Sequence, residues 1–251
     1  MHILVVTAVP AERDAVTAAT AGRPERISVP GGFELHRTRP AAAGGMSDGP
    51  DAAEGPYVLD ALAAGVGPAA AAAGAATALT AAALGGHRYD LVVSAGIGGG
   101  FAPGAPVGSL VVAEEIAAAD LGAETPDGFV PVTALGFGTD AHRPPEELVA
   151  AVAAATGALP GTVLTGSTVT GSAARAKELL ARHPRALAEA MEGFGVAEAA
   201  AAHGVPVLEL RTISNPVGPR DRAAWRIGEA LAALTAAFAD LPRALSSRST
   251  P

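Results

Sequence analysis

The stretch "YDLVVSAGIGGGF", residues 89–101, decides the fold class of this chain. Its first half is an uninterrupted apolar run, which is typical of a strand that is buried on both faces of a sheet. Three consecutive glycines follow at 98–100, and a simple turn explains such a cluster poorly. Because open α/β sheets bind ligands at the carboxyl ends of their strands, the glycines predict backbone that lines a pocket. A purely structural bend is the alternative.

Short apolar runs and longer Ala-rich segments alternate along the rest of the chain. Strands are expected at 2–8, 26–30, 33–39, 57–65, 108–120, 161–172 and 205–214, and helices at 11–20, 68–84, 145–155, 175–184, 191–204 and 222–241. The alternation predicts an α/β fold, with one three-layer α/β/α domain over residues 1–241 around a central mixed β-sheet. Residues 41–55 are expected to form an exposed, flexible loop, and residues 242–251 a disordered tail.

The composition excludes several classes of function. The 251 residues include no cysteine, so the chain has no disulfide, no thiolate nucleophile and no Cys-ligated metal. The formal net charge is −8 and the Lys and Arg residues do not cluster, which argues against a nucleic-acid-binding surface. The six histidines are scattered without paired ligand spacing, so no metal site is expected.

The Ala-rich tract 61–84 raises the question of a membrane segment. Glycines and a proline interrupt it, and alanine favours membrane insertion only weakly, so a helix outside the membrane is expected. The N-terminal apolar run is short and lacks the positive flank and cleavage site of a signal peptide. We therefore expect a cytoplasmic protein without a membrane partner.

A second glycine motif, "GVGPAA" at 65–70, loosely matches the fingerprint of dinucleotide-binding folds. That function also needs an acidic residue at the end of the next strand, to hold a ribose hydroxyl. The next strand ends in "VVSAGIGGGF", which has no carboxylate, so no nicotinamide cofactor is expected. Gly65 and Gly67 are interpreted instead as residues of a tight turn or of backbone that approaches a ligand.

Three polar residues lie at positions where chemistry is possible. Glu12 follows Pro10 by two residues, where a carboxylate also complements the dipole of a helix. Glu192 is a charge within the small and apolar segment "AEAMEGFG", so it either faces the interior with a specific partner or stays exposed. Asn215 lies where the last strand opens into a loop, and its alternative role is to organise the turn before Pro216.

Five blocks of sequence occur in the order found in the nucleoside phosphorylase and nucleosidase superfamily. They are "VVTAVPAERDAV", "AAGVGPAAAAAGA", "VVSAGIGGGF", "AMEGFGVAEAA" and "LRTISNPVGPRDRAAW". Over residues 1–240 the chain resembles this superfamily, and within it the futalosine hydrolases, which are relatives of the methylthioadenosine/S-adenosylhomocysteine nucleosidases. The resemblance implies a nucleoside phosphorylase-like fold, a pocket for a purine ribonucleoside and a homodimer. The apolar stretch "GFVPVTALGFG", 128–138, is the expected dimer edge.

The resemblance also implies roles for individual residues. Glu12 matches the acid that positions or deprotonates the attacking water. Met191 and Glu192 match a pair in which the methionine lies against the ribose and the glutamate holds ribose hydroxyls. The other implied substrate contacts are the pocket-wall residues Ile97 and Gly98 and, where the nucleosidases stack an aromatic ring on the base, Thr168 and Val169. Because that ring is missing here, Phe194 and Phe137 are considered as substitutes.

Asn215 departs from the adenine nucleosidases, which carry an aspartate at this position. An asparagine amide can donate to N7 or O6 of a 6-oxopurine, but it cannot protonate N7 of adenine. We therefore expect Asn215 to select hypoxanthine, the base of futalosine, whose hydrolysis belongs to menaquinone biosynthesis. Since asparagine cannot deliver a proton, Asp221 is the candidate general acid, and its alternative role is to cap the last helix.

Three other functions are weighed against hydrolysis. A phosphorylase needs a dianion site, and "GIGGG" lacks both serine and arginine, so hydrolysis is favoured. An adenine nucleosidase would carry the aspartate that Asn215 replaces. A non-catalytic nucleoside-binding protein would not need both Glu12 and Glu192. The non-purine end of the substrate is left open, with Arg39, Arg143 and Arg220 as possible carboxylate partners.

Overall fold

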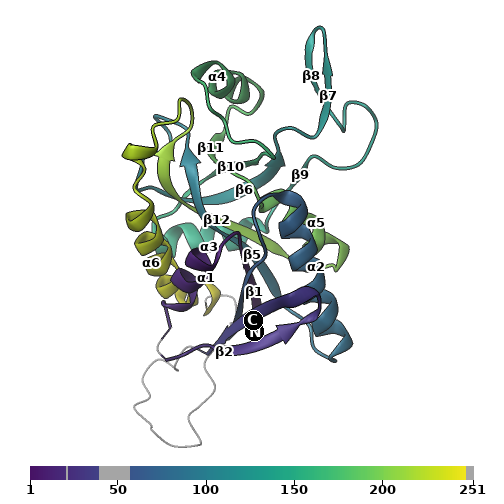
Figure 1. The fold of residues 1–251 in the computed structure, drawn as a ribbon, viewed down its shortest axis with the longest axis vertical. Coiled ribbons are helices and arrows are strands. Elements are labelled where there is room, and N and C mark those ends of the chain that lie inside the picture. Colours follow the sequence, from purple (N-terminus) through teal and green to yellow (C-terminus); the bar gives the residue numbers. More distant parts are fainter. Residues whose placement is uncertain (21, 40–56, 247–251) are drawn as a thin grey trace, which may run out of the picture.

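The computed structural model describes residues 1–20, 22–39 and 57–246. Its main sheet has ten strands in the order β11-β10-β6-β12-β5-β1-β4-β3-β2, with β9 paired to β6. These strands are β1 (His2–Thr7), β2 (Glu25–Val29), β3 (Phe33–Thr38), β4 (Val58–Ala63), β5 (Leu91–Gly100), β6 (Leu110–Ala118), β9 (Ala141–His142), β10 (Leu159–Thr165), β11 (Ala186–Ala190) and β12 (Val207–Pro216). A separate hairpin of β7 (Gly122–Thr125) and β8 (Gly128–Pro131) projects from the body (Figure 1).

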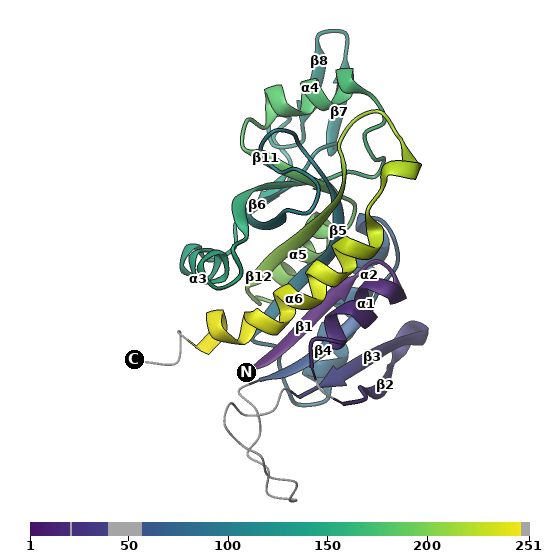
Figure 2. The ribbon, with the colours of Figure 1, turned by 90° about the vertical axis from the view of Figure 1, so that its left-hand side faces the viewer.

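Helices cover both faces of the sheet. They are α1 (Pro10–Thr17), α2 (Pro68–Leu84), α3 (Glu146–Thr156), α4 (Ala173–Arg182), α5 (Gly193–Ala202) and α6 (Ile227–Ser246). Alternate residues of β1 point to opposite faces: Leu4 and Val6 pack with α2 and α5, whereas Ile3 and Val5 pack with α1, α3 and α6. Figure 2 shows α6 lying across the second face. The expected three-layer fold with a mixed sheet is confirmed.

The glycines of "GIGGG" lie inside β5, and none of them has a positive φ. Two of them allow other backbone to approach: a Cβ on Gly98 would lie 2.9 Å from the carbonyl oxygen of Glu189, and one on Gly100 would lie 2.1 Å from that of Ala105. This close approach lets β11 pair with the end of β5 as well as with β10. Strands β5, β12, β6, β10 and β11 therefore close into a ring, which the sequence did not indicate.

Several expected boundaries were wrong. The strand expected over 161–172 ends at Thr165, and β11 was not expected at all. The last helix begins at Ile227 rather than at 222, after the short 3-10 turn Arg222–Ala224. It continues through Pro242 to Ser246, so residues 242–246 are not part of a disordered tail. Leu241, Ala244 and Leu245 are buried in the core, which explains why the helix persists beyond the proline.

The expected loop 41–55 and residues 247–251 lie outside the described residues. None of the described helices is long and apolar enough to span a membrane.

A buried ion-pair network ties the sheet together at the end opposite the strand carboxyl termini. Asp60 on β4 is fully buried and accepts hydrogen bonds from Arg37 on β3, His2 on β1 and Tyr89 just before β5. Burial by itself would raise the pKa of the Asp60 carboxyl, but these hydrogen bonds together hold that pKa well below its usual value. Asp60 therefore stays ionised and joins four elements.

We predict that Asp60→Asn lowers the free energy of unfolding by about 3 kcal/mol at pH 7, because it leaves the partly buried Arg37, whose side chain is 19% exposed, without its counter-charge. The stabilisation from a carboxylate with a lowered pKa is present above the unfolded pKa and is lost as pH falls through the folded one. The difference between wild type and variant should thus be largest above about pH 5 and shrink in acid. Urea unfolding across this pH range measures it.

The matched control is Asp90→Asn, because Asp90 is exposed and accepts a single backbone hydrogen bond from His2. This change should cost less than about 1 kcal/mol. Equal destabilisation by both variants, or a gap between Asp60→Asn and wild type that does not depend on pH, would contradict the assignment.

Candidate active site

A cavity of about 510 Å³ opens at the carboxyl ends of β1, β5, β11 and β12. Its wall is formed by residues that end or directly follow these strands: Ala8, Val9, Ile97, Gly98, Gly99, Ala190, Met191, Glu192, Ser214, Asn215 and Pro216. The loop from Val217 to Trp225 completes the wall. The glycine-rich end of β5 therefore lines a pocket, as the sequence predicted.

Glu12 bridges the first strand and the glycine-rich strand. Its Oε2 accepts hydrogen bonds from the backbone N–H groups of Ala8 (3.0 Å) and Val9 (3.2 Å), and its Oε1 accepts one from Ile97 (2.9 Å). Burial raises the pKa of the Glu12 carboxyl, whereas the charge of Arg211 and the backbone donors lower it. A Cβ at Gly96 would lie 2.5 Å from Oε1 of Glu12, so glycine is required for this arrangement.

Arg211, which sequence reasoning missed, does not line the cavity but contacts the lining residue Glu192 from within the core. Its side chain is 1% exposed. Its Nε donates to Oε1 of Glu209 at 2.9 Å, its Nη2 donates to Oγ of Ser94 at 3.0 Å, and its Nη1 lies 3.3 Å from Oε2 of Glu192. The guanidinium of Arg211 thus forms ion pairs with the carboxylates of Glu209 and Glu192. Its charge also lowers the pKa of a third carboxyl, that of Glu12.

Glu209 is fully buried on β12 and was also missed. Burial raises the pKa of its carboxyl to about 7, although Arg211 opposes the shift. Among the described residues, Oε2 of Glu209 has no hydrogen-bond partner. The signal for both residues was in the sequence: Glu209 and Arg211 are two apart in a strand, so their side chains lie on the same side of it.

Glu192 faces the interior, and its specific partner is Arg211. It directly precedes the first residue of α5, rather than lying within the helix as expected. Its Oε1 accepts from the backbone N–H of Gly67 (3.2 Å), and its Oε2 accepts from that of Met191 (3.3 Å). Gly67 has a φ of 96°, a conformation that favours glycine, so the "GVG" motif is a tight turn that also supplies a donor to this carboxylate.

Asn215 has a fixed amide orientation. Ser214 Oγ donates to its Oδ1 at 2.8 Å, and its Nδ2 donates to the carbonyl oxygen of Pro216 at 3.0 Å. An amide nitrogen carries two hydrogens, so one donor is left in a residue that lines the cavity. The strand β12 is irregular at Ser214 and continues to Pro216, so Asn215 lies within the strand end rather than in the loop.

The remaining expected residues are divided between two cavities. Val169 lines the main cavity, whereas Thr168 lines only a neighbouring cavity of about 340 Å³. Asp221 lines the main cavity and its Oδ1 accepts from the backbone N–H of Ala223, so it caps the turn Arg222–Ala224 instead of the last helix. Buried Glu189, another residue that was missed, lines both cavities.

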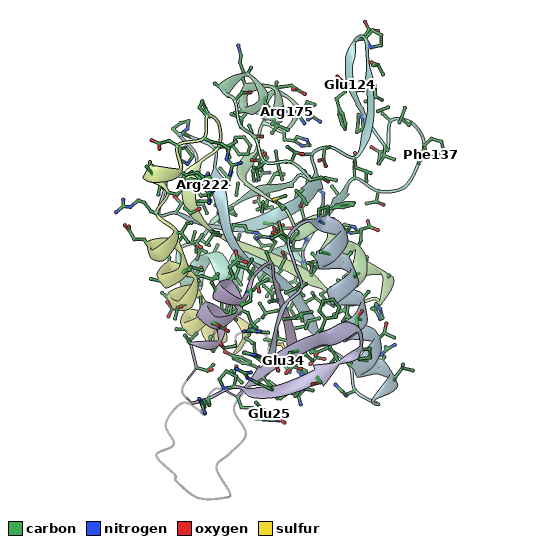
Figure 3. The ribbon with its side chains drawn as sticks, viewed as in Figure 1. Glu25, Glu34, Glu124, Phe137, Arg175 and Arg222 are labelled. Atoms are coloured by element: carbon green, nitrogen blue, oxygen red, sulfur yellow. The ribbon has the colours of Figure 1, made fainter. Side chains whose placement is uncertain are left out.

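The aromatic residue of the main cavity is Trp225 rather than either phenylalanine. Phe194 is buried beside His142 and does not line the cavity, and Phe137 is 67% exposed on the loop after β8 (Figure 3). Trp225 falls within the helix expected over 222–241, but in the structure it precedes α6. In the described parts of the chain, no three His, Asp or Glu side chains are grouped so that they could hold a metal ion.

Comparison with known proteins places this geometry in a family. The sequence matches the phosphorylase superfamily over residues 2–246. It is 68% identical over 247 residues to a futalosine hydrolase from Streptomyces coelicolor, covering 98% of this chain and 97% of that protein. A futalosine hydrolase from Acidothermus cellulolyticus is 50% identical over 161 residues, which cover 62% of this chain and 65% of the relative.

Solved structures share the fold. A methylthioadenosine/S-adenosylhomocysteine nucleosidase from Colwellia psychrerythraea, in complex with adenine, aligns with a TM-score of 0.74 and 22% identity over 98% of this chain and 95% of that one. A futalosine hydrolase mutant from Helicobacter pylori aligns with a TM-score of 0.75 and 19% identity, over 96% and 98% of the two chains. The chain belongs to the phosphorylase superfamily and, within it, to the family of the futalosine hydrolases.

Proposed function

We propose that this chain hydrolyses the N-ribosidic bond of futalosine and releases hypoxanthine, as a step of menaquinone biosynthesis in the cytoplasm. The observation that carries the proposal is the 68% identity, over nearly the whole of both chains, to a protein named futalosine hydrolase. The orientation of the Asn215 amide supports the choice of base independently.

In this proposal Glu12 activates the attacking water. A carboxylate has about four lone-pair positions, and three backbone N–H groups occupy three of them. One position on Oε1 therefore remains for a water hydrogen. Burial raises the pKa of the Glu12 carboxyl, which makes it a stronger base than an exposed glutamate, while the charge of Arg211 favours its ionised form.

In this proposal Glu192 and Met191 bind the ribose of the substrate. Backbone donors and Arg211 fix the Glu192 carboxylate, so that it can accept hydrogen bonds from ribose hydroxyls without reorganising. Bond cleavage builds positive charge on the sugar ring, which a nearby carboxylate stabilises more in the transition state than in the ground state. Ile97, Gly98 and Val169 contribute the apolar wall.

In this proposal Asn215 binds the departing base. Cleavage leaves negative charge on hypoxanthine, and the free N–H of the Asn215 amide can donate to it. Such a hydrogen bond to a charged group contributes about 1.5–3 kcal/mol, or one to two decades in rate. Asp221 is exposed on the same cavity wall, and in this proposal its carboxyl, or water, supplies the proton that asparagine cannot. Thr168 is left without a direct role, because it lines the neighbouring cavity.

Phosphorolysis is disfavoured by the charges around the cavity. Of the lining residues that the structure describes, Arg220 is the single Lys or Arg, whereas a phosphate dianion usually needs several cationic donors. Arg13 pairs with Asp14 and Arg175 with Glu178, and neither lines this cavity. Glu12, Glu189, Glu192 and Asp221 would instead repel a phosphate.

The proposed function is tested by incubating the purified protein with futalosine and with methylthioadenosine, with and without phosphate, and identifying the free base. We expect hypoxanthine from futalosine at a rate that does not depend on phosphate, and much slower release of adenine. Glu12→Gln is the inactive control, with a rate lowered by about 10²–10⁴-fold. Adenine as the faster product, a ribose phosphate product, or nucleoside binding without base release would contradict the proposal.

We further predict that Asn215→Asp lowers the preference for inosine over adenosine, measured as a ratio of kcat/KM, by at least about tenfold. A carboxylate cannot donate to O6 of hypoxanthine, but it can accept from the 6-amino group of adenine. The matched variant is Ser214→Ala, which frees the amide to rotate and should slow hypoxanthine release without reversing the base preference. An unchanged ratio in Asn215→Asp would remove Asn215 from base selection.

We also propose that the protein is a homodimer and that the stretch 128–138 lies at the subunit contact. Phe137 is 67% and Leu135 42% exposed in this stretch, and clustered exposed apolar side chains mark interfaces. Figure 3 shows Phe137 on a loop that extends away from the body. Sedimentation velocity should give a dimer for the wild type and a monomer for Phe137→Glu; a monomeric wild type would contradict the proposal.

A further inference from the structure

Glu189 on β11 is a buried carboxylate of the cavity wall to which the proposed reaction assigns no role. The residue is 7% exposed and lines both the main cavity and the neighbouring one. Its Oε2 accepts a hydrogen bond from the backbone N–H of Thr170 at 2.9 Å, and its Oε1 accepts one from the Thr170 hydroxyl. Among the residues that the structure describes, no Lys, Arg or His side chain lies within ion-pair distance of it.

These contacts leave the Glu189 carboxylate with unused acceptor capacity. A carboxylate has about four lone-pair positions, and the two donors of Thr170 occupy two of them. Burying a carboxylate that has neither a cation nor a full set of donors is costly. A ligand that brings an N–H group to this wall of the cavity would therefore be bound favourably.

The sheet register places Glu189 and Asn215 on either side of Gly99. Glu189 of β11 pairs with Gly99 of β5, and Asn215 of β12 pairs with the same glycine from the other side. Directly paired residues of neighbouring strands point to the same face, so both side chains lie on one face. A Cβ on Gly99 would lie 3.3 Å from Nδ2 of Asn215, so it would project into the space beside the amide. Because glycine has no side chain, this space remains part of the cavity, which all three residues line.

The two side chains present a donor and an acceptor to that space. Asn215 has one free N–H, and the Glu189 carboxylate has free lone pairs. A 6-oxopurine carries the complementary groups on adjacent atoms, since its O6 accepts and its N1–H donates. In adenine both are reversed, because the 6-amino group donates and N1 accepts. Adenine would therefore place the lone pair of N1 against the carboxylate, which disfavours its binding.

We propose that Glu189 is a specificity-determining residue that accepts a hydrogen bond from N1–H of a 6-oxopurine whose O6 accepts from Asn215. The inference deepens the proposed function and rests on it, because Asn215 binds the departing base there. The N1–H group supplies a donor that the buried carboxylate lacks within the protein. The choice of hypoxanthine over adenine thus depends on a carboxylate and an amide together.

The test is the equilibrium Kd of the full chain for free hypoxanthine and for free adenine, measured by isothermal titration calorimetry. The variant is Glu189→Gln, whose side chain has the same size and can still bond to Thr170, since an amide both accepts and donates. We expect the preference for hypoxanthine over adenine to fall by about ten- to a hundredfold, because the new amide can donate to N1 of adenine. Wild type should also bind 1-methylhypoxanthine, which lacks N1–H, at least about tenfold more weakly than hypoxanthine.

Thr170→Val is the matched control. It removes the hydroxyl that bonds to Glu189 but leaves the carboxylate in place, so the preference should stay within about threefold of the wild-type value. Equal weakening of both bases in Glu189→Gln, the same change of preference in Thr170→Val, or equal wild-type affinities for hypoxanthine and 1-methylhypoxanthine would overturn the role of Glu189. A wild type that releases no hypoxanthine from futalosine would instead overturn the proposed function, and the Kd values would still judge Glu189.

Discussion

One buried guanidinium, that of Arg211, is the constraint on which the active-site end of this molecule depends. Its side chain is 1% exposed and lies between Glu209 and Glu192, with Ser94 as a third acceptor. Moving a charge out of water costs several kcal/mol, so such a group persists only when its partners are well placed. The partners come from β5, β12 and the residue before α5, which fixes the relative positions of three elements that form the cavity wall.

Glycines make room for these charges. A Cβ on Gly96 would lie 2.8 Å from Nη1 of Arg211, and one on Gly193 would lie 2.2 Å from Oε2 of Glu209. The side chains of Arg211 and Glu209 therefore occupy space that a side chain at position 96 or 193 would otherwise fill. The glycines of β5 are therefore part of the site rather than of a turn, because the carboxylates and β11 can approach the strand only where side chains are missing.

The sequence predicts best where local pattern and tertiary packing agree. The apolar run of β1 and the Pro-initiated, Ala-rich helix α2 were located almost to the residue. Strand β11 was missed because "ALAEA" has no β-branched or aromatic residue, and its strand conformation comes from pairing with β10 and β5. The end of α6 was missed because burial of residues beyond Pro242 outweighs the local preference of proline.

At the site, sequence reasoning found the residues that resemble a family motif and missed those that support them. Glu12, Glu192 and Asn215 lie in quoted blocks, and the structure brings all three to one cavity. Arg211 lies in the same block as Asn215 and Glu209 directly precedes that block, but only the burial of β12 makes their charges significant. The position of Trp225 depends on where α6 begins, a boundary that a single sequence defines poorly.

We propose that the charge of Arg211 favours the ionised form of Glu12, which activates water in the proposed reaction. The direct measurement is the pH dependence of kcat/KM for futalosine in the double variant Arg211→Met with Glu209→Leu, which removes the cation together with the fully buried carboxylate and leaves Glu192 as the one carboxylate that loses its ion-pair partner. Without the cation, the pKa of Glu12 should rise further, because the charge of Arg211 lowers it. We expect the acid limb of the profile to move to higher pH. A folded double variant whose acid limb coincides with that of the wild type would contradict the account.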